Sequence, residues 1–544
     1  MHGRFLWDDP VEITGNPELR DLRGLGKIWF SPADPDYYPL KTTVQWAEWH
    51  LWGARVEGYH VVSVALHVLS ALLLWRLLRQ LGVTQAWLGG LIFAVHPLTV
   101  ESVAWISELK NTLSLPFVLL ALIGWSDSEN SKFGIRNSKY FLSLLYFLAA
   151  LLCKSSVVMF PFVLLLYSWW KRGRAGRADI IASAPFFLLS LLFGCVTLWF
   201  QSHRAIGVDV MRMPGLASRA ADAGPAVWFY LFKGVIPFHP LPVYPSWHFG
   251  ARSPVSWLAW AALAAALGWI WSLRAGWGRH VLFGFGFFLI NLVPVLGFVP
   301  MYYLHIARVG DQFVYLPLVG LAGLAAAAIG KVDAASRRVS TRNAARYRVY
   351  LLSAIVSAIV LALAISSHLY AGVFASDESL WTYTLRFNPG AWLAQNNLAG
   401  LRFAENRLDE ALAAYEQALR IRPGYPEADI GMGNCLERGG RPDLAIPWYR
   451  RALRIIPNSP EAHNNLGYAL ERVGRLPEAI TQFDLAISAR ADLPLAYYNR
   501  ANALSAAGRL PDAILSYQKA LQLKPDFPEA RHNLDLARRM AGLP

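Results

Sequence analysis

The sequence has little charge for its length. Lys, Arg, Asp and Glu make up 16% of its 544 residues, whereas soluble domains carry nearer about a quarter. The deficit is local, because residues 56–375 are strongly apolar while residues 388–544 have an ordinary soluble balance. This composition excludes a chain built only of soluble domains and indicates a membrane-embedded part followed by a soluble one.

The sequence also has little cysteine. Cys153, Cys195 and Cys435 are the only three, and no CxxC pair occurs, so neither a disulfide framework nor a cysteine-based zinc site is indicated. There is no HExxH helix, no GxSxG elbow and no glycine-rich phosphate loop. These absences disfavour hydrolysis and nucleotide-driven transport.

Basic residues exceed acidic ones, giving a formal net charge of +14. Nucleic-acid binding is not the preferred explanation, because much of the excess lies in short loops between apolar stretches. Such loops face the cytoplasm in membrane proteins. Five of them recur along the chain, within residues 76–79, 132–139, 171–177, 274–279 and 331–348.

Ten apolar stretches are read as membrane spans. Several are near the lower length limit for crossing about 30 Å of hydrocarbon. The predicted spans are residues 56–75, 86–106, 112–125, 140–153, 156–170, 179–200, 255–273, 280–299, 311–330 and 350–374.

The basic loops also predict the orientation. With all five in the cytoplasm the ten spans alternate, and residues 1–55, 201–254, 300–310 and everything after 375 lie outside. Residues 1–55 would then be exported with no signal peptide or span before them. We therefore expect a first transmembrane helix upstream of Met1 that this sequence lacks.

A 34-residue period runs through the soluble part. Small residues recur where two helices would touch, an aromatic fills the gap, and proline ends the second helix. This pattern is typical of tetratricopeptide repeats, and it predicts four of them over residues 388–544, closed by a capping helix over 528–541. The registers are Ala411, Ala445, Ala479 and Ala513; Tyr415, Tyr449, Phe483 and Tyr517; and Pro423, Pro457 and Pro525.

Asparagine recurs on the first helices of these repeats. A tetratricopeptide stack has no chemistry of its own and binds peptide segments or other proteins on its concave face. A ladder of side-chain amides there could hold a peptide backbone, with Asn397, Asn434, Asn465 and Asn499 as its rungs, joined by Asn396 and Asn464. The alternative is ordinary asparagine on helix surfaces.

Two adjacent carboxylates, Asp8 and Asp9, lie between Trp7 and Pro10. Outside the membrane surface they could bind a divalent cation or take a proton from an acceptor hydroxyl. The alternative is that they cap a helix or begin a turn, as adjacent acids commonly do.

Several short segments together resemble one family. They are Asp8-Asp9, Tyr37-Tyr38-Pro39-Leu40, the run from His96 to Glu101, Glu108-Leu109-Lys110-Asn111, Cys153-Lys154-Ser155-Ser156 and the run from Asp311 to Pro317. The chain is similar in these segments to the transmembrane-and-tetratricopeptide proteins. Those are polytopic relatives of protein O-mannosyltransferases in the GT-C glycosyltransferase superfamily.

The resemblance implies a transferase that moves a sugar from a polyprenyl-phosphate donor to an acceptor outside the membrane. The catalytic acidic pair of GT-C enzymes corresponds here to Asp8 and Asp9. One departure is Gln312, where relatives tend to have arginine after the aspartate. Arg308, one helical turn earlier, could take over its phosphate contact.

Other polar residues near the predicted outer surface fit this picture, because charge near bilayer depth usually faces a cavity or a partner. Lys110, Lys154 and Arg308 are candidates for the donor phosphate; the alternative for both lysines is snorkelling to the interface. Supporting candidates are Glu101, which could pair with one of these cations, Asp311, and His96 and His305, which could bind a sugar or be structural. The aromatic segment 238–245 could lie beside the site.

The sequence thus predicts an all-α protein: a first outer loop over 1–55, a GT-C-like transmembrane helical bundle over 56–375, and a tetratricopeptide-repeat solenoid over 388–544. The predicted activity is transfer of a mannose-like sugar to protein hydroxyls on the extracytoplasmic side. Its partners would be the lipid-linked sugar, an acceptor protein bound by the repeats, and membrane lipid. The alternative is a non-catalytic membrane scaffold that assembles envelope proteins.

Overall fold

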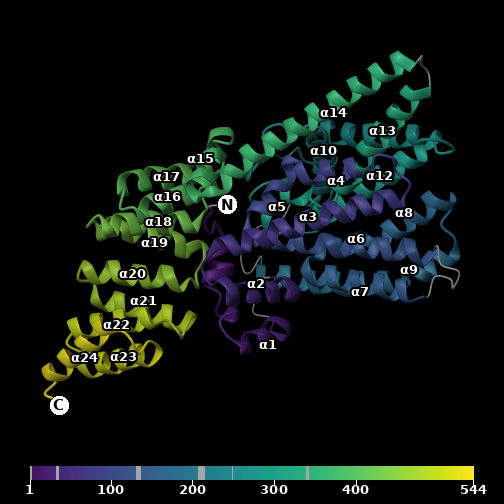
Figure 1. Ribbon diagram of the computed structural model, residues 1–544. Coiled ribbons are helices and arrows are strands. Elements are labelled where there is room, and N and C mark those ends of the chain that lie inside the picture. The colour runs from purple at the N-terminus through teal and green to yellow at the C-terminus, as the bar shows by residue number, and fades with distance from the viewer. Residues whose placement is uncertain are drawn as a thin grey trace. The chain divides into compact units, whose positions relative to one another are not determined.

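The structure, a computed structural model, describes residues 3–31, 36–129, 137–205, 215–247, 249–299, 301–338 and 342–543. Throughout these ranges the regular elements are helices, which confirms the predicted all-α class. Parts of two predicted basic loops, residues 130–136 and 339–341, lie outside the described residues. The chain divides into two compact units, Met1–Phe387 and Asn388–Pro544, which we name the bundle unit and the repeat unit (Figure 1).

The bundle unit contains fifteen α-helices in its described residues. They are α1 (Leu22–Phe30), α2 (Pro39–Trp52), α3 (Val56–Gln80), α4 (Ala86–Val95), α5 (Val100–Ala104), α6 (Leu109–Glu129), α7 (Ser138–Cys153), α8 (Phe160–Arg172), α9 (Arg177–Phe200), α10 (Leu216–Val235), α11 (Pro254–Ser272), α12 (Gly278–Leu292), α13 (Leu318–Arg338), α14 (Arg342–Ala371) and α15 (Asp377–Phe387).

Seven helical segments are long and apolar enough to cross a membrane, so the unit is a multi-pass membrane domain. An eighth span is formed if α4 and the segment Pro97–Ala104, bent by 60° from it, count as one. The bend falls at His96-Pro97, since proline disfavours helical backbone in the residue before it. The seven are Val56–Gln80, Ile106–Glu129, Arg177–His203, Pro254–Ser272, Gly278–Val295, Leu318–Ser336 and Tyr347–Ala375.

The prediction of ten spans is supported for these eight. The other two predicted spans correspond to α7, with 16 residues, and α8, with 13. At about 1.5 Å per residue a 16-residue helix is roughly 24 Å long, shorter than the hydrocarbon core. Both helices meet α9 through Phe147, Phe160 and Phe186, which are fully buried against one another. The other face of α7 exposes Phe141 and Leu145, so whether α7 and α8 count as spans stays a prediction.

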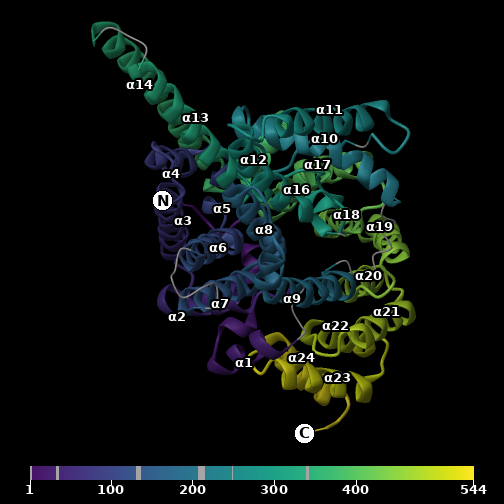
Figure 2. The ribbon, with the colours of Figure 1, turned by 90° about the vertical axis from the view of Figure 1, so that its right-hand side faces the viewer.

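The segment 201–254, predicted as an outer loop, contains the 20-residue helix α10, which packs beside α11 (Figure 2). Three charged residues, Arg219, Asp222 and Lys233, lower the hydropathy of this stretch, which is why an apolar-run criterion misses it. Asp222 is nevertheless 1% exposed, so the helix carries charge into the interior.

The close contact between α12 and α13 depends on glycine. A Cβ atom at Gly320 of α13 would lie 2.3 Å from the carbonyl oxygen of Gly284 in α12. Small residues of this kind allow membrane helices to approach closely. The outer face of α14, by contrast, exposes Leu351, Ile355 and Ile359, as expected for a surface in contact with lipid.

The residues before α3 are not an extended loop. The turns η1 (Pro10–Thr14) and η2 (Pro17–Leu19) and the helices α1 and α2 fold over the bundle. Their small core joins Ile13, Leu19 and Ile28 to Tyr59 of α3 and to Ile106. The segment that carries the acidic pair is therefore fixed to the ends of the spans.

The repeat unit consists of four helix pairs and a final helix that follow one another in chain order (Figure 1). They are α16 (Trp392–Ala404), α17 (Leu408–Ile421), α18 (Pro426–Arg438), α19 (Pro442–Ile455), α20 (Pro460–Arg472), α21 (Leu476–Ala489), α22 (Pro494–Ala506), α23 (Leu510–Leu523) and α24 (Pro528–Met540).

The period places equivalent residues at equivalent contacts. The alanine register is fully buried in every pair, and Phe483 of the aromatic register is buried in the third. Truncating such a phenylalanine to alanine typically costs about 3–5 kcal/mol. Gly440, Gly474 and Gly508 end the first helices with positive φ, and Asn406 takes that place in the first repeat.

Candidate active site

The two acidic residues have separate environments. Asp9 is fully buried, and both of its carboxylate oxygens accept hydrogen bonds. Oδ2 accepts the backbone N–H of Leu6 at 2.9 Å, and Oδ1 accepts the backbone N–H and the hydroxyl of Ser107 at 2.8 and 2.5 Å. Asp9 therefore ties the N-terminal segment to the turn η4 (Ile106–Glu108) that begins the α6 span.

Local sequence explains why the pair separates. Pro10 begins η1, and Trp7 has a φ of +50°, so the chain turns sharply on both sides of the pair. The Trp7 ring stacks on Trp105 with centroids 4.8 Å apart and planes 9° apart. This turn directs the two carboxylates to different neighbours.

Asp8 is less buried than Asp9 and less fully hydrogen-bonded within the described residues. It is half-buried, and its Oδ1 has no hydrogen-bond partner among the described residues. The pKa of Asp8 is raised to about 7, mainly by burial and next by the negative charge of Glu12, while the ammonium groups of Lys110 and Lys41 oppose the rise. A carboxylate with a pKa near neutrality is suited to exchanging a proton with a substrate.

Two lysines surround Asp8 and Glu12. Lys41 of α2 forms a 2.5 Å ion pair with Glu12. Burial opposes ionisation of Glu12, but the charges of Lys41 and Lys110 outweigh it and lower its pKa. Lys110 forms a 2.9 Å ion pair with Glu108. The cluster is thus built from the N-terminal segment, α2 and the start of α6.

A hydrogen-bond path leads from Lys110 to Lys154. Glu108 pairs with Lys110 and also accepts from the side-chain amide of Asn111, whose amide oxygen in turn accepts from the Lys154 ammonium. The same amide donates to the Ser102 hydroxyl at 3.1 Å. Two of the three cations predicted for the donor phosphate, Lys110 and Lys154, are therefore brought together.

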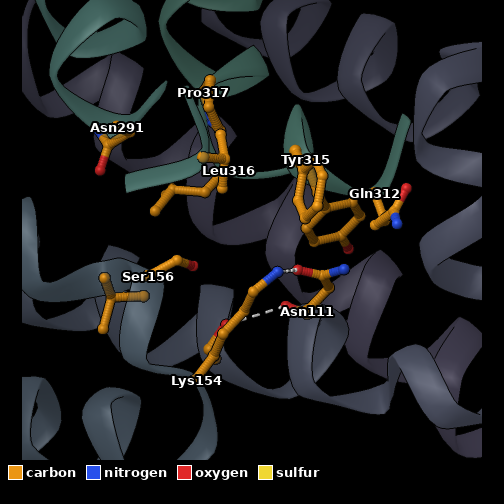
Figure 3. Close-up of a pocket in the computed structure, with 12 residues that line it drawn as sticks. Asn111, Lys154, Ser156, Asn291, Gln312, Tyr315, Leu316 and Pro317 are labelled. Atoms are coloured by element: carbon orange, nitrogen blue, oxygen red, sulfur yellow. Dashed lines mark hydrogen bonds between the residues drawn. The ribbon is translucent and has the colours of Figure 1, made fainter. Parts of the chain in front are cut away.

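Lys154 lies at a small cavity where three of the segments that carry the family resemblance meet (Figure 3). Asn111 comes from α6, Lys154 and Ser156 from the turn after α7, and Gln312 and Tyr315 from the run that begins at Asp311. Segments about 40 and 200 positions apart thus share one wall.

A second polar cluster surrounds Asp311. The hydroxyl of Tyr244 donates to Asp311 Oδ1 at 2.9 Å, while Asp311 Oδ2 is buried with no hydrogen-bond partner in the described chain. Burial raises the pKa of Asp311 to about 7. Glu101, fully buried, accepts the backbone N–H of Gln312 at 3.1 Å. Its expected cation partners are engaged elsewhere, and the aromatic segment 238–245 lies beside Asp311.

Arg308 belongs to a different contact set from Lys110. It is 5% exposed and forms a 3.5 Å ion pair with Asp222 of α10. Asp222 also accepts the backbone N–H groups of Phe249 and Gly250 at 3.0 and 3.1 Å. The guanidinium donates to the carbonyl of Arg219 as well. These contacts make Arg308 a bridge between α10 and the segment around residue 308. They are internal contacts, so they do not point to the phosphate contact expected of Arg308 in place of an arginine at position 312.

The two candidate histidines differ in burial. His96 is 2% exposed; its Nδ1 accepts the backbone N–H of Leu98, and its Nε2 donates to the carbonyl of Gly234 in α10. Both ring nitrogens are used inside the fold, which favours the structural alternative for His96. His305 is half-buried in the turn η8 (Tyr302–His305).

The acidic pair does not fit a divalent cation held by both carboxylates. Each oxygen of Asp9 already accepts from an N–H or O–H group, and a cation would have to displace those donors. Within the described ranges no group of three or more His, Cys, Asp or Glu side chains is arranged to hold a metal.

The asparagines of the repeats bond to one another. The amide of Asn465 donates to Asn434, that of Asn499 to Asn464, and that of Asn533 to Asn502, at 3.0, 3.0 and 3.1 Å. Each bond joins one repeat to the preceding helix pair. The predicted ladder exists, but most of its amides serve the stack itself.

The first repeat breaks this pattern. Gly431 occupies the position that is asparagine at 397, 465, 499 and 533, so no amide reaches back from the second repeat. A Cβ at Gly431 would lie 2.3 Å from the ring of Tyr415, which fills the space. Correspondingly, Asn396 Oδ1 and Asn397 Nδ2 have no hydrogen-bond partner among the described residues.

Several site residues could not be singled out from the sequence. Ser107, Glu12 and Lys41 become significant only through contacts with distant segments. Tyr244 lies in the aromatic segment 238–245, but its bond to Asp311 could not be predicted. Asn111 had a signal, since it lies in a segment that carries the resemblance. Glu12 had a weaker one, four residues after Asp8, which is one helical turn.

These features define a multi-pass, all-helical membrane protein with a buried acidic site and C-terminal tetratricopeptide repeats. Tetratricopeptide-repeat family models match residues 390–458, 448–481 and 494–527, which confirms the repeats. Solved structures similar to this part include that of MamA, 26% identical over 27% of this chain and 85% of that one with a TM-score of 0.26. Another is YrrB, "a TPR protein with an unusual peptide-binding site", 24% identical over 31% of this chain and 88% of that one with a TM-score of 0.27.

The curated relatives are named protein O-mannosyl-transferases. One from Caenorhabditis elegans is 31% identical over 139 residues, 23% of this chain and 20% of the relative. Protein O-mannosyl-transferase TMTC4 of Homo sapiens is 27% identical over 182 residues, 28% of this chain and 25% of the relative. The matches thus span about a fifth to a quarter of these relatives. The chain is similar to transmembrane-and-tetratricopeptide O-mannosyltransferases, as its sequence segments predict.

Proposed function

We propose that the protein is a membrane glycosyltransferase that moves a mannose-like sugar from a polyprenyl-phosphate donor to hydroxyl groups of proteins on the extracytoplasmic side. The observation that carries this proposal is the difference in hydrogen bonding between the two acidic residues. Asp9 is fixed by Leu6 and Ser107, while Asp8 keeps a free carboxylate oxygen beside Lys110. The names of the relatives support the sugar and the acceptor class.

The reaction is a direct displacement. Asp8 accepts the proton of an acceptor hydroxyl as its oxygen attacks the anomeric carbon of the sugar. The bond between that carbon and the phosphate oxygen breaks, and the electron pair leaves with the polyprenyl phosphate. Asp8 then releases its proton to solvent. A pKa of about 7 for Asp8 makes both the uptake and the release of the proton possible near neutral pH.

Lys154 and Lys110 are the groups suited to the leaving phosphate. The Lys154 ammonium bonds an uncharged amide oxygen, that of Asn111, so its charge is not directly neutralised there. Lys110 shares its charge with Glu108 but is 24% exposed at its side chain, which leaves it reachable. Charge-assisted bonds from such groups stabilise phosphate oxygens strongly. Arg308, committed to Asp222, has a structural role in this proposal, while Glu101 and Asp311 hold the segment that lines the Lys154 cavity.

The repeats would recruit the acceptor protein. Asn396 Oδ1 and Asn397 Nδ2 of the first repeat are buried and have no hydrogen-bond partner among the described residues. They are one acceptor and one donor, which is what a peptide backbone admitted to this face would require. Asn434, Asn465 and Asn499 would contribute mainly by fixing the stack on which the acceptor lies.

Transfer can be tested with the full chain in nanodiscs. The probe is polyprenyl-phosphate mannose labelled in the sugar, supplied with a short serine- and threonine-containing peptide. The proposal predicts labelled peptide and an equal amount of released polyprenyl phosphate. Labelled peptide that appears only with a nucleotide-sugar donor, or no labelled peptide at all, would refute it and favour the scaffold.

The extracytoplasmic placement is tested separately. The basic loops place the repeats outside the cytoplasm, so a periplasmic or lumenal reporter fused after Pro544 should be active and a cytoplasmic one inactive. The opposite result would put the acidic pair on the wrong side for an outer-leaflet donor.

A further inference from the structure

Three described residues other than glycine have a positive φ angle: Trp7 at +50°, His239 at +48° and Asn406 at +61°. Residues with a Cβ adopt this conformation rarely, and they keep it only where surrounding contacts hold them. Asn406 ends a repeat helix where the other repeats have glycine, and asparagine tolerates this backbone. Trp7 and His239 are bulky, so their turns need support from elsewhere in the fold.

The support for Trp7 comes from α15, the last helix of the bundle unit. Asp377, at the start of α15, accepts the backbone N–H of Trp7 through Oδ1 at 2.9 Å. One turn later the ring of Trp381, 1% exposed, meets Trp7 edge to face with centroids 5.0 Å apart. Trp105 stacks on the Trp7 ring at 4.8 Å. The turn that presents Asp8 is therefore held through both its backbone and its ring.

The other end of the same helix holds the second strained turn. The ring of Phe387 meets that of His239 edge to face at 4.9 Å. The hydroxyl of Tyr383 donates to the carbonyl oxygen of Pro240 at 3.2 Å. This turn leads directly to Tyr244.

The two strained turns belong to the two polar clusters of the candidate site. The turn at Trp7 carries Asp8, and the segment after His239 carries Tyr244, which donates to Asp311. Both are held by one helix of 11 residues. Its last residue, Phe387, is followed directly by Asn388, the first residue of the repeat unit.

We infer that α15 is a positioning helix for the transfer reaction and that Asp377 and Trp381 are the positioning residues that hold Asp8 in place. This inference rests on the proposed function for its catalytic part. The helix from which the repeats extend is then the same one that sets the geometry of the base. Misplacing a reacting group by about 1 Å can cost roughly 100-fold in rate.

The test compares Asp377→Ala with Asp377→Asn in the full chain. The asparagine retains an oxygen that can accept the Trp7 N–H, whereas the alanine does not. Thr382→Ala, an exposed position on the same helix, is the matched control. Two readouts are used: hydrogen–deuterium exchange of the peptide that covers residues 5–12, and kcat and KM for a short acceptor peptide.

The inference predicts faster exchange at residues 5–12 and a loss of roughly 10- to 100-fold in kcat for Asp377→Ala. The KM for the peptide should change little, because the acceptor contacts remain. Asp377→Asn should restore both readouts toward the parent, and Trp381→Phe should retain more kcat than Trp381→Ala. Unchanged exchange in Asp377→Ala, or the same loss in Thr382→Ala, would overturn the inference. If the parent transfers no sugar, the proposed function fails, while the exchange comparison still decides whether α15 holds the Asp8 turn.

Discussion

Ser107 donates both its backbone N–H and its hydroxyl to one carboxylate oxygen of Asp9, although 98 positions of sequence separate them. The contact fixes the N-terminal segment to the start of α6, the helix that carries Lys110. This contact anchors Asp9, and in the proposed reaction Asp8 is the base.

Replacing Asp9 with alanine should destabilise the protein more than replacing an exposed capping residue. The change leaves the buried N–H groups of Leu6 and Ser107 without acceptors, at a cost of about 1–3 kcal/mol each. Asp21→Ala removes the exposed N-cap of α1 and should cost about 1 kcal/mol. Thermal unfolding in detergent measures both, and equal melting temperatures for the two variants would contradict the anchoring role of Asp9.

The rate of transfer should fall as pH drops through about 7, because Asp8 must be ionised to accept a proton and burial raises its pKa to about 7. Glu12→Gln removes a negative neighbour that raises this pKa. The acid limb of kcat/KM should therefore move to lower pH in that variant, while staying above the usual range for aspartate because the burial remains. Glu57→Gln, an exposed position, should leave the profile unchanged. A shift to higher pH in Glu12→Gln would count against Asp8 as the base.

Lys154→Met and Arg308→Met should fail in different ways. Lys154→Met removes a cation from the cavity and should lower kcat/KM for the donor roughly 10- to 100-fold, since a charge-assisted hydrogen bond contributes about 1.5–3 kcal/mol. Arg308→Met leaves Asp222 buried without its cation, which typically costs about 3–5 kcal/mol of folding stability. Donor titrations and melting curves on both variants check this. A normally stable Arg308→Met protein with weakened donor binding would return Arg308 to the donor site.

Asparagine substitutions in the repeats should separate recognition from stability. Asn397→Ala removes an amide whose Nδ2 has no hydrogen-bond partner among the described residues and whose oxygen accepts a long 3.3 Å bond from the adjacent Asn396. Acceptor KM should therefore rise while the melting temperature stays near that of the parent. Asn499→Ala removes the bond to Asn464 between two repeats and should lower the melting temperature of the repeat unit. If both variants have the same melting temperature and the same acceptor KM, the unpartnered amide atoms of Asn396 and Asn397 have no role in recognition.

What the sequence predicts well is what local periodicity controls. The in-phase registers of Ala411 and Tyr415 predict the repeats because each helix pair meets its neighbour in the same way. The seven long apolar helices follow from apolar runs. By contrast, the sequence does not predict α10, because Asp222 and the charged residues near it lower the hydropathy of this buried helix. The cation that pairs with Asp222, Arg308, is distant in sequence.

The candidate site was predicted in its residue types but not in its pairings. Lys110 and Lys154 are linked through Glu108 and Asn111, and Lys110 is among the charges that act on Asp8. The distinct roles of Asp8 and Asp9 could not be predicted, since adjacent carboxylates look alike until the turn at Trp7 directs them to different partners. For His96, the partner two residues away at Leu98 is local, but the partner at Gly234 of α10 could not be predicted from the sequence.

The central claim is that Asp8 is the base of a sugar transfer, and the most direct measurement is the transfer rate of Asp8→Asn protein in nanodiscs with labelled polyprenyl-phosphate mannose. The variant should fold with the melting temperature of the parent, because Asp8 Oδ1 has no internal partner among the described residues. It should bind donor and acceptor normally and transfer sugar roughly 10² to 10⁴ times more slowly. Transfer at the parent rate by a folded Asp8→Asn protein would contradict the account, leaving the acidic pair as a turn and the protein as a membrane-anchored scaffold.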